Sequence, residues 1–227
     1  MRSILNKLLP ILIVTLVSGC AATSSMPFAE SDVEPESSKP LYLMTVVVKN
    51  TYMERYQPRI LNIVLTKDAG AGKTEDLVFL MDKKGIIRAA DKKSSTSLVR
   101  LRGGDSFNMV KGMLANASAF PVSGYYFVPL YAQLESDAPG IYYLGAVQAT
   151  IRERKENEFR AGPVIPLIDQ AVTGASTGTF DIDIVDLYDQ DVALFRATFP
   201  ALGNVTIIKK VLPQWDRVRA QTEWEKN

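Results

Sequence analysis

Residues 125–151, YYFVPLYAQLESDAPGIYYLGAVQATI, carry the richest apolar and aromatic sequence of the chain. Two runs in it, 125–134 and 141–151, abound in tyrosine, phenylalanine and β-branched residues, which favour strands. Pro139-Gly140 between the runs indicates a turn. We therefore expect two aromatic strands joined by a turn, with aromatic side chains in cross-strand pairs. The residues expected to pair are Tyr125, Tyr126, Phe127, Tyr131, Tyr142 and Tyr143.

Short runs of the same kind recur on both sides of this stretch. Residues 180–185 alternate strictly, with apolar Phe180, Ile182 and Ile184 separated by aspartates. Glycine, proline, asparagine and aspartate punctuate the runs, a spacing typical of an antiparallel β-sandwich. The further predicted strands are residues 41–48, 60–66, 77–81, 98–101, 107–113 and 205–212. The expected fold class is therefore mostly β, an antiparallel β-sandwich with one or two short α-helices.

Two segments are predicted to be helical. Pro166 suits the first position of a helix, and Gly174 suits its C-cap, with an apolar stripe between them. The second helix covers residues 192–198 and ends at a proline. Asp189 or Asp191 is predicted to cap its N-terminus, because aspartate is a preferred N-cap residue.

Composition narrows the classes of function. The 227 residues include 26 Lys and Arg, 25 Asp and Glu, no His and one Cys. Balanced charge argues against a nucleic-acid partner, which would need a basic surface. Without histidine, the chain lacks the commonest general base and metal ligand, and one cysteine excludes an internal disulfide or a cysteine cluster. We therefore expect no enzymatic activity, no cofactor, no metal and no nucleic-acid partner.

A glycine-rich segment at residues 70–74, GAGKT, looks like part of a nucleotide-binding loop. The full motif is GxxxxGK[ST], and Lys67 stands where its first glycine belongs. A strand, rather than the required helix, is predicted to follow. We interpret this segment as a hairpin loop and expect no nucleotide partner.

The N-terminus is the most specific signal. An apolar run at 8–17 follows two cationic residues and is shorter than the ~20 residues that span a bilayer, as in a signal peptide. The sequence VSGC at 17–20 resembles the lipobox of bacterial lipoproteins. The resemblance implies cleavage before Cys20 and a membrane partner held through acyl chains on Cys20. Because Ala21 follows rather than aspartate, it also implies an outer-membrane location facing the periplasm.

The rest of the chain is similar to uncharacterised bacterial lipoproteins with a β-sandwich domain, through YFVP at 126–129 and PGIYYLG at 139–145. A serine-rich, acidic stretch after Cys20 is interpreted as a tether with a span of roughly 25 Å. The predicted organisation is a signal peptide at 1–19, the lipidated cysteine and flexible tether at 20–40, the β-sandwich at 41–212 and a polar C-terminal tail at 213–227.

Three charged clusters are expected to be solvated surface. Asp181 and Asp183 belong to the outer face of a strand, with a weak cation site as the alternative. Mixed charges at 152–160 are expected at an exposed edge, and the alternative is contact with lipid head groups, a polysaccharide or an acidic partner. Basic residues at 83–93 are expected in a loop, and a membrane-facing role is the alternative.

The segment 159–170 combines glycine, two prolines and polar residues beside an apolar stripe, close to the expected tyrosine strands. The candidate binding surface comprises Tyr142, Tyr143, Arg160, Asp169 and Gln170. The function expected is that of a membrane-anchored envelope lipoprotein, a non-enzymatic binding or structural module with an envelope protein as its partner. Two alternatives stay open: a periplasmic-side carrier or sensor of a small or lipidic ligand, and an envelope hydrolase with paired carboxylates.

Overall fold

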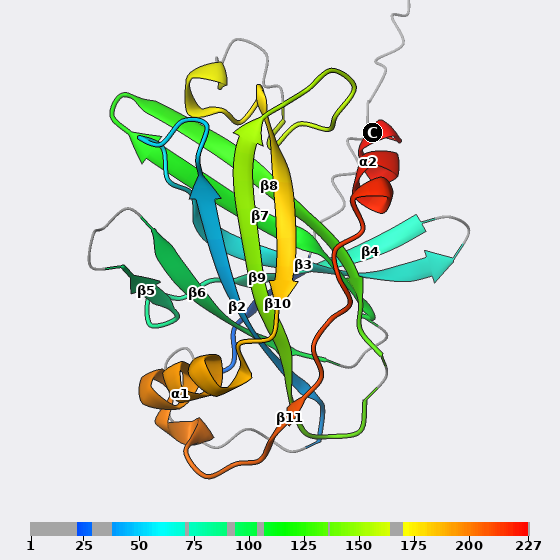
Figure 1. Cartoon of the computed structure of the whole chain (residues 1–227). Coiled ribbons are helices and arrows are strands. Elements are labelled where there is room, and N and C mark those ends of the chain that lie inside the picture. Colours follow the sequence, from blue (N-terminus) through cyan, green and yellow to red (C-terminus); the bar gives the residue numbers. More distant parts are fainter. Residues whose placement is uncertain are drawn as a thin grey trace, which may run out of the picture.

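The computed structural model describes residues 22–28, 38–70, 73–89, 94–103, 107–135, 137–163 and 170–226. Its strands form two sheets that pack face to face, and α-helices lie at two ends of the molecule (Figure 1). The expected β-sandwich with two short α-helices is therefore confirmed.

The first sheet, sheet A, has the strand order β1-β4-β3-β7-β8. Its strands are β1 (Ala22–Ser25), β3 (Arg59–Gly70), β4 (Lys73–Leu80), β7 (Met109–Ala119) and β8 (Val122–Gln133). Neighbouring strands pair antiparallel, except that β1 runs parallel to β4. The β3–β4 pair confirms that the segment expected as a hairpin loop joins two strands.

The second sheet, sheet B, has the order β10-β9-β2-β6-β5, and β11 pairs separately with β9. Its strands are β2 (Leu41–Asn50), β5 (Ile86–Arg88), β6 (Ser95–Arg102), β9 (Ile141–Glu153), β10 (Gly178–Val185) and β11 (Ile207–Lys209). The expectation of purely antiparallel pairing was wrong, because β2 and β11 both run parallel to β9. The sheets are mixed.

The turn at Pro139-Gly140 does not close a hairpin. It lies where the chain passes from β8 in sheet A to β9 in sheet B. The predicted aromatic pairs across this turn were therefore wrong. Tyr142 instead packs against Tyr42 with ring centroids 5.9 Å apart, and Tyr143 meets Tyr188 edge to face at 5.5 Å.

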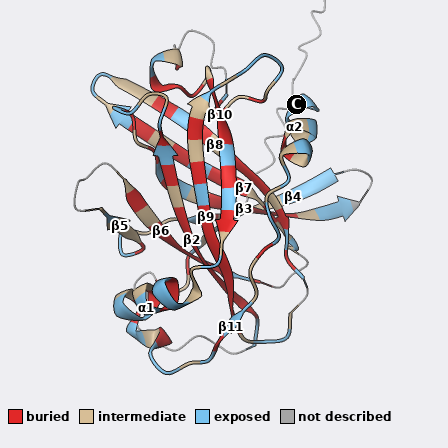
Figure 2. Ribbon diagram, viewed as in Figure 1, coloured by how far each residue is buried: buried red, intermediate tan, exposed pale blue. Residues whose placement is uncertain are grey.

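Sheet B is buried on both faces over part of its area. Its inner face joins the main core against sheet A, where Val46 and Val147 lie beside Met113. Its outer face is covered by α1 (Tyr188–Thr198) and the 3-10 turn η2 (Pro200–Leu202), through residues such as Phe195. Strands buried on two faces read as continuous apolar runs, which explains β2 and β9. Figure 2 shows this burial in the central strands and the exposure of much of β4.

The predicted aspartate cap of α1 was wrong. Leu187 occupies the N-cap position, and Asp191 lies one turn further into the helix, with 3% of its surface exposed. The Asp191 carboxylate accepts hydrogen bonds from Thr45 Oγ1 and the Tyr143 hydroxyl, each at 2.6 Å. Two buried hydroxyls in sheet B therefore decide the position of this aspartate.

Two other local predictions were confirmed. Gly174 is the C-cap as predicted, with a left-handed φ of 81° that glycine adopts without strain, but the described end of the segment expected to be a helix forms only the short 3-10 turn η1 (Ala171–Thr173). Pro166 lies outside the described residues. In β10, Phe180 is buried and Asp181 is exposed, as the alternation predicted.

Residues 22–28 are not a flexible tether, contrary to expectation. Four of them form β1 at the edge of sheet A, and Met26 and Phe28 are buried. The carbonyl oxygen of Pro27 accepts a hydrogen bond from Arg100 Nε at 2.7 Å. The two apolar side chains give this polar stretch enough buried contact to order it.

The C-terminal residues also pack on the body. After the polar stretch, α2 (Arg217–Glu225) buries Ala220 in the main core. Trp215 Nε1 donates to Pro129 O at 2.7 Å, and Gln221 Oε1 accepts from the Phe159 amide at 2.7 Å. The segment predicted as a polar tail therefore contributes to the fold.

Candidate functional site

Two residues of the predicted binding surface, Tyr142 and Tyr143, lie on opposite faces of sheet B. Tyr142 belongs to the core between the sheets, and its hydroxyl donates to Ala138 O at 3.0 Å. Tyr143 is fully buried in the cluster that includes α1. Burial, and then the hydrogen bond to Asp191, raise the pKa of the Tyr143 hydroxyl. Both tyrosines pack and hydrogen-bond within the fold.

The other predicted residues hold loops. Gln170 is 1% exposed, and its side chain joins the Tyr125 amide to the carbonyl oxygen of Pro163, each at 2.8 Å. Arg160 Nη1 donates to Ser176 O at 3.2 Å. Asp169 and the predicted lipidation site Cys20 lie outside the described residues. The structure therefore brings Arg160 and Gln170 into one loop region but does not join them to the tyrosines in a shared surface.

A cleft of about 300 Å³ lies between residues of the two sheets. Sheet A contributes Arg59 at the start of β3, whose partner in the ladder is Asn116 of β7. Sheet B contributes Arg88 at the end of β5, which pairs with Ser95 of β6. Each arginine is therefore held on a strand beside a polar residue of the next strand. The lining residues are Gln57, Pro58, Arg59, Arg88, Ser94, Ser95, Asn116 and Ser118.

Some polar side chains of this cleft already form hydrogen bonds within the protein, whereas others have no partner in the described chain. Gln57 is fixed, because its Nε2 donates to Asn50 O at 2.9 Å and its Oε1 accepts from the Asn50 amide at 3.0 Å. Arg59 and Arg88 are exposed, and neither guanidinium forms a hydrogen bond or ion pair within the described chain. None of the lining residues that the structure describes is acidic, so the two positive charges have no neutralising partner among them.

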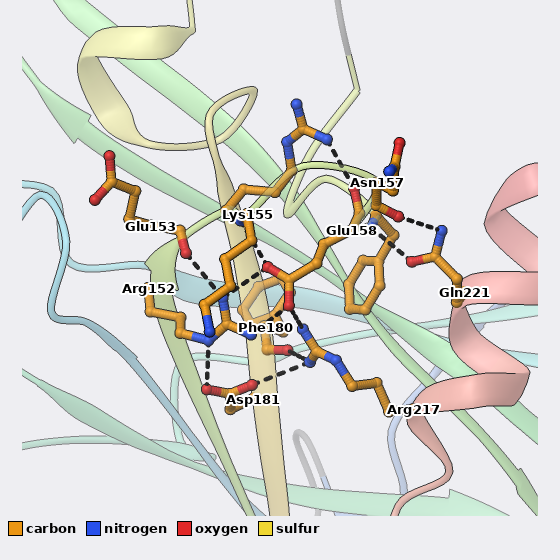
Figure 3. Close-up of polar contacts among 11 residues, drawn as sticks. Arg152, Glu153, Lys155, Asn157, Glu158, Phe180, Asp181, Arg217 and Gln221 are labelled. Atoms are coloured by element: carbon orange, nitrogen blue, oxygen red, sulfur yellow. Dashed lines mark hydrogen bonds and ion pairs between the residues drawn. The ribbon is translucent and has the colours of Figure 1, made fainter.

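A second polar cluster joins β9, β10 and α2 (Figure 3). Glu158 Oε1 lies 2.6 Å from Arg152 Nη2 and 2.9 Å from Arg217 Nη2. Asp181 also bridges the two arginines, at 2.8 Å to Arg152 and 3.0 Å to Arg217. The charge run expected to be solvated surface therefore fastens the C-terminal helix to sheet B. The hydrogen bond from Arg152 is the main cause that lowers the pKa of Glu158 to about 2.

This low pKa predicts an acid-sensitive contribution to stability. Glu158 should stabilise the fold above its ordinary pKa of 4.5, and that contribution should be lost as the pH falls from about 4.5 to about 2. Because solvent screens these partly exposed pairs, we expect Glu158→Gln to lower the free energy of unfolding by only about 1–2 kcal/mol at neutral pH. Urea unfolding at several pH values measures it. If the difference in free energy of unfolding between the parent and Glu158→Gln did not shrink as the pH falls, the stabilising role of ionised Glu158 would be contradicted.

Two of the described carboxyl groups have a shifted pKa. The pKa shifts found among them are downward, in Glu158 and in Asp186 beside Lys209. A carboxylic acid that donates a proton near neutral pH needs a raised pKa. Among the described residues, no group of three or more His, Cys, Asp or Glu is arranged to hold a metal ion. The groups that the described structure does offer are suited to recognition by charge and hydrogen bonding.

Sequence reasoning missed the cleft because its walls come from segments far apart in the chain. The prediction that Arg88 belongs to a basic loop was wrong, because Arg88 is the last residue of strand β5 and pairs with Ser95. One available signal was the alternation in β7, where polar Asn116 and Ser118 follow buried Ala115 and Ala117. That pattern marks a polar strand face, but it does not say what lies opposite.

In the part of the chain that the structure describes, no helix is long and apolar enough to cross a membrane. Comparison of the chain with models of protein families, with curated proteins and with solved structures found no match in any of the three.

Proposed function

We propose that this chain is a lipid-anchored protein of the bacterial cell envelope that acts as a non-enzymatic binding module on the periplasmic side of the outer membrane. The lipobox-like sequence at 17–20 and the short apolar run before it support the anchor. Acyl chains on Cys20 would hold the protein at the membrane, because each buried methylene contributes about 0.8 kcal/mol.

The observation that carries the binding function is the cleft with two unengaged arginines. Ligand sites are concave and largely preformed, with a few polar groups that fix the orientation of the ligand. Here Arg59 and Arg88 stand on paired strands, so their backbone positions are set before any ligand arrives. The polar lining favours a polar small ligand over a lipidic one.

A second candidate is an envelope protein as partner, favoured by Phe120. This residue lies between β7 and β8 and exposes 93% of its surface. Exposed aromatic side chains are enriched where proteins meet. A module of this kind would use the end of the β7–β8 pair for contact and leave the cleft free.

Two measurements test the proposal on the full chain. Native mass spectrometry after extraction in mild detergent should show the mass of acyl groups and of a bound polar molecule. In intact cells, p-benzoylphenylalanine at position 120 reports on a protein partner, with position 218 as the control because Val218 is also exposed, at 76%. A chain with no acyl mass, no bound molecule and no specific crosslink at 120 would contradict the proposal.

A further inference from the structure

We propose that the cleft binds an oxyanion, a phosphate or carboxylate, carried by a small hydroxyl-bearing molecule such as a phosphorylated sugar. This inference deepens the proposed binding function and rests on it, but it does not depend on the lipid anchor. It follows from the charge, the hydrogen-bonding groups and the size of the cleft.

The charge of the lining selects the sign of the ligand. Arg59 and Arg88 approach from different sheets, and no carboxylate among the described lining residues competes for them. Guanidinium groups present several N–H donors in a plane that matches the oxygens of a phosphate or carboxylate. Arg152 and Arg217, by contrast, share the carboxylates of Glu158 and Asp181, whereas the two cleft arginines have no such partner in the described chain.

The remaining groups suit hydroxyls on the same ligand. Asn116 uses its Nδ2 toward Gly124 O at 3.3 Å, and Ser118 shares a hydrogen bond with Ser123 at 2.8 Å. Each keeps further hydrogen-bonding capacity, because an amide oxygen and a hydroxyl accept more than one bond. Ser94 and Ser95 contribute two more hydroxyls from the opposite wall. Hydroxyls on both walls, together with the amide of Asn116 on one of them, favour a ligand that itself carries several hydroxyl groups.

The size of the cleft limits the ligand. A volume of about 300 Å³ lies at the lower end of the range for small-molecule sites. A small polar molecule fits such a space, and Pro58 is the one lining residue of the described chain with a wholly apolar side chain. A phosphate of a lipid head group shares the same chemistry and could present itself to the two arginines from a membrane surface, so the test must separate the two sources.

The test uses the full mature chain in nonionic detergent, titrated calorimetrically with glucose 6-phosphate, glucuronate, inorganic phosphate and glucose. At least one anionic probe should bind and glucose should bind more weakly. Arg59→Ala or Arg88→Ala should weaken binding about tenfold, and the double variant about a hundredfold. Arg102→Ala is the matched control, since Arg102 is also exposed, lies at the far end of β6 and has no partner in the described chain. Its affinity should equal that of the parent.

Competition between phosphatidylglycerol vesicles and the soluble probes shows whether the oxyanion belongs to a lipid or to a free small molecule. If vesicles of phosphatidylglycerol bind the parent and the double variant loses that binding, while the soluble probes do not bind, the oxyanion is a lipid head group. If the soluble probes bind and vesicles do not compete, it is a free small molecule. Equal binding by the parent and the double variant, glucose binding as tightly as the anions, or no binding of any anionic probe or vesicle would overturn the inference. The proposed function would still stand in those cases if native mass spectrometry showed acyl groups and a different bound polar molecule.

Discussion

Cys20→Ser is expected to abolish incorporation of radioactive palmitate and to prevent normal membrane retention of the mature protein. The serine hydroxyl cannot replace the thiolate as the acylated nucleophile, so the chain would lose its acyl chains. A stable anchor needs at least two lipid or electrostatic contributions, and the acyl chains would supply all of them here.

Ser18→Ala is the matched control, because it keeps a small residue at the lipobox position two before the cysteine. Palmitate labelling and fractionation of cells should give the same result for this variant as for the parent. A Cys20→Ser protein that is labelled and retained like the parent would refute the anchor.

Strand β1 begins two residues after Cys20, which limits how far the folded domain can lie from a lipid anchor. Only Ala21 separates Cys20 from β1, so the Cα atoms of Cys20 and Ala22 lie at most about 7 Å apart. Because β1 is paired with β4, a lipidated Cys20 would hold the β1–β4 edge of sheet A close to the bilayer. This differs from the span of roughly 25 Å that a flexible tether would allow.

The second large effect is expected for Arg100→Met, which should lower the free energy of unfolding by about 3–5 kcal/mol. Arg100 is fully buried, forms an ion pair with Asp82, and donates to Leu98 O and Pro27 O, each at 2.7 Å. Its guanidinium also lies 4.0 Å from the ring centroid of Phe199. Burial lowers the pKa of Arg100, while Asp82 favours its charged form. Removal of the arginine strands the Asp82 carboxylate.

Urea unfolding of the full chain, followed by circular dichroism, measures this loss. The double variant Arg100→Met/Asp82→Asn should be less destabilised than the sum of the single changes, because it removes the stranded charge. Since Pro27 O would lose its donor, residues 22–28 should also become more sensitive to protease in Arg100→Met. A loss below about 1 kcal/mol would show that the pair behaves like an exposed surface ion pair.

Local composition predicted most of the strands but not how they pair. The run at 41–48 lies within β2, and 141–151 lies within β9, because β-branched and aromatic residues favour strands wherever they are placed. The partners of these strands were misjudged. An aromatic run followed by Pro-Gly suggests a hairpin, yet 134–140 carries the chain to the other sheet.

For the polar residues too, the sequence indicates the local element but not the partners. Asp191 reads as a helix cap in the sequence, and only the approach of Thr45 and Tyr143 makes it a buried acceptor. Arg100 looks like one cation in an ordinary strand, although the fold buries it beneath Phe199. The composition of the nearest residues says nothing of partners that lie 48 to 146 positions away.

By itself, the sequence determined the β-rich class, most of the strand positions and the helix before Pro200, and it carries the lipobox-like motif at the N-terminus. These depend on propensity, periodicity and short motifs, which are local properties. Only the tertiary structure decided the parallel β2–β9 pairing, the docking of 22–28 and the placement of Arg59 and Arg88 at one cleft. Those features depend on contacts between distant segments, and their free energy exists only once both sheets have formed.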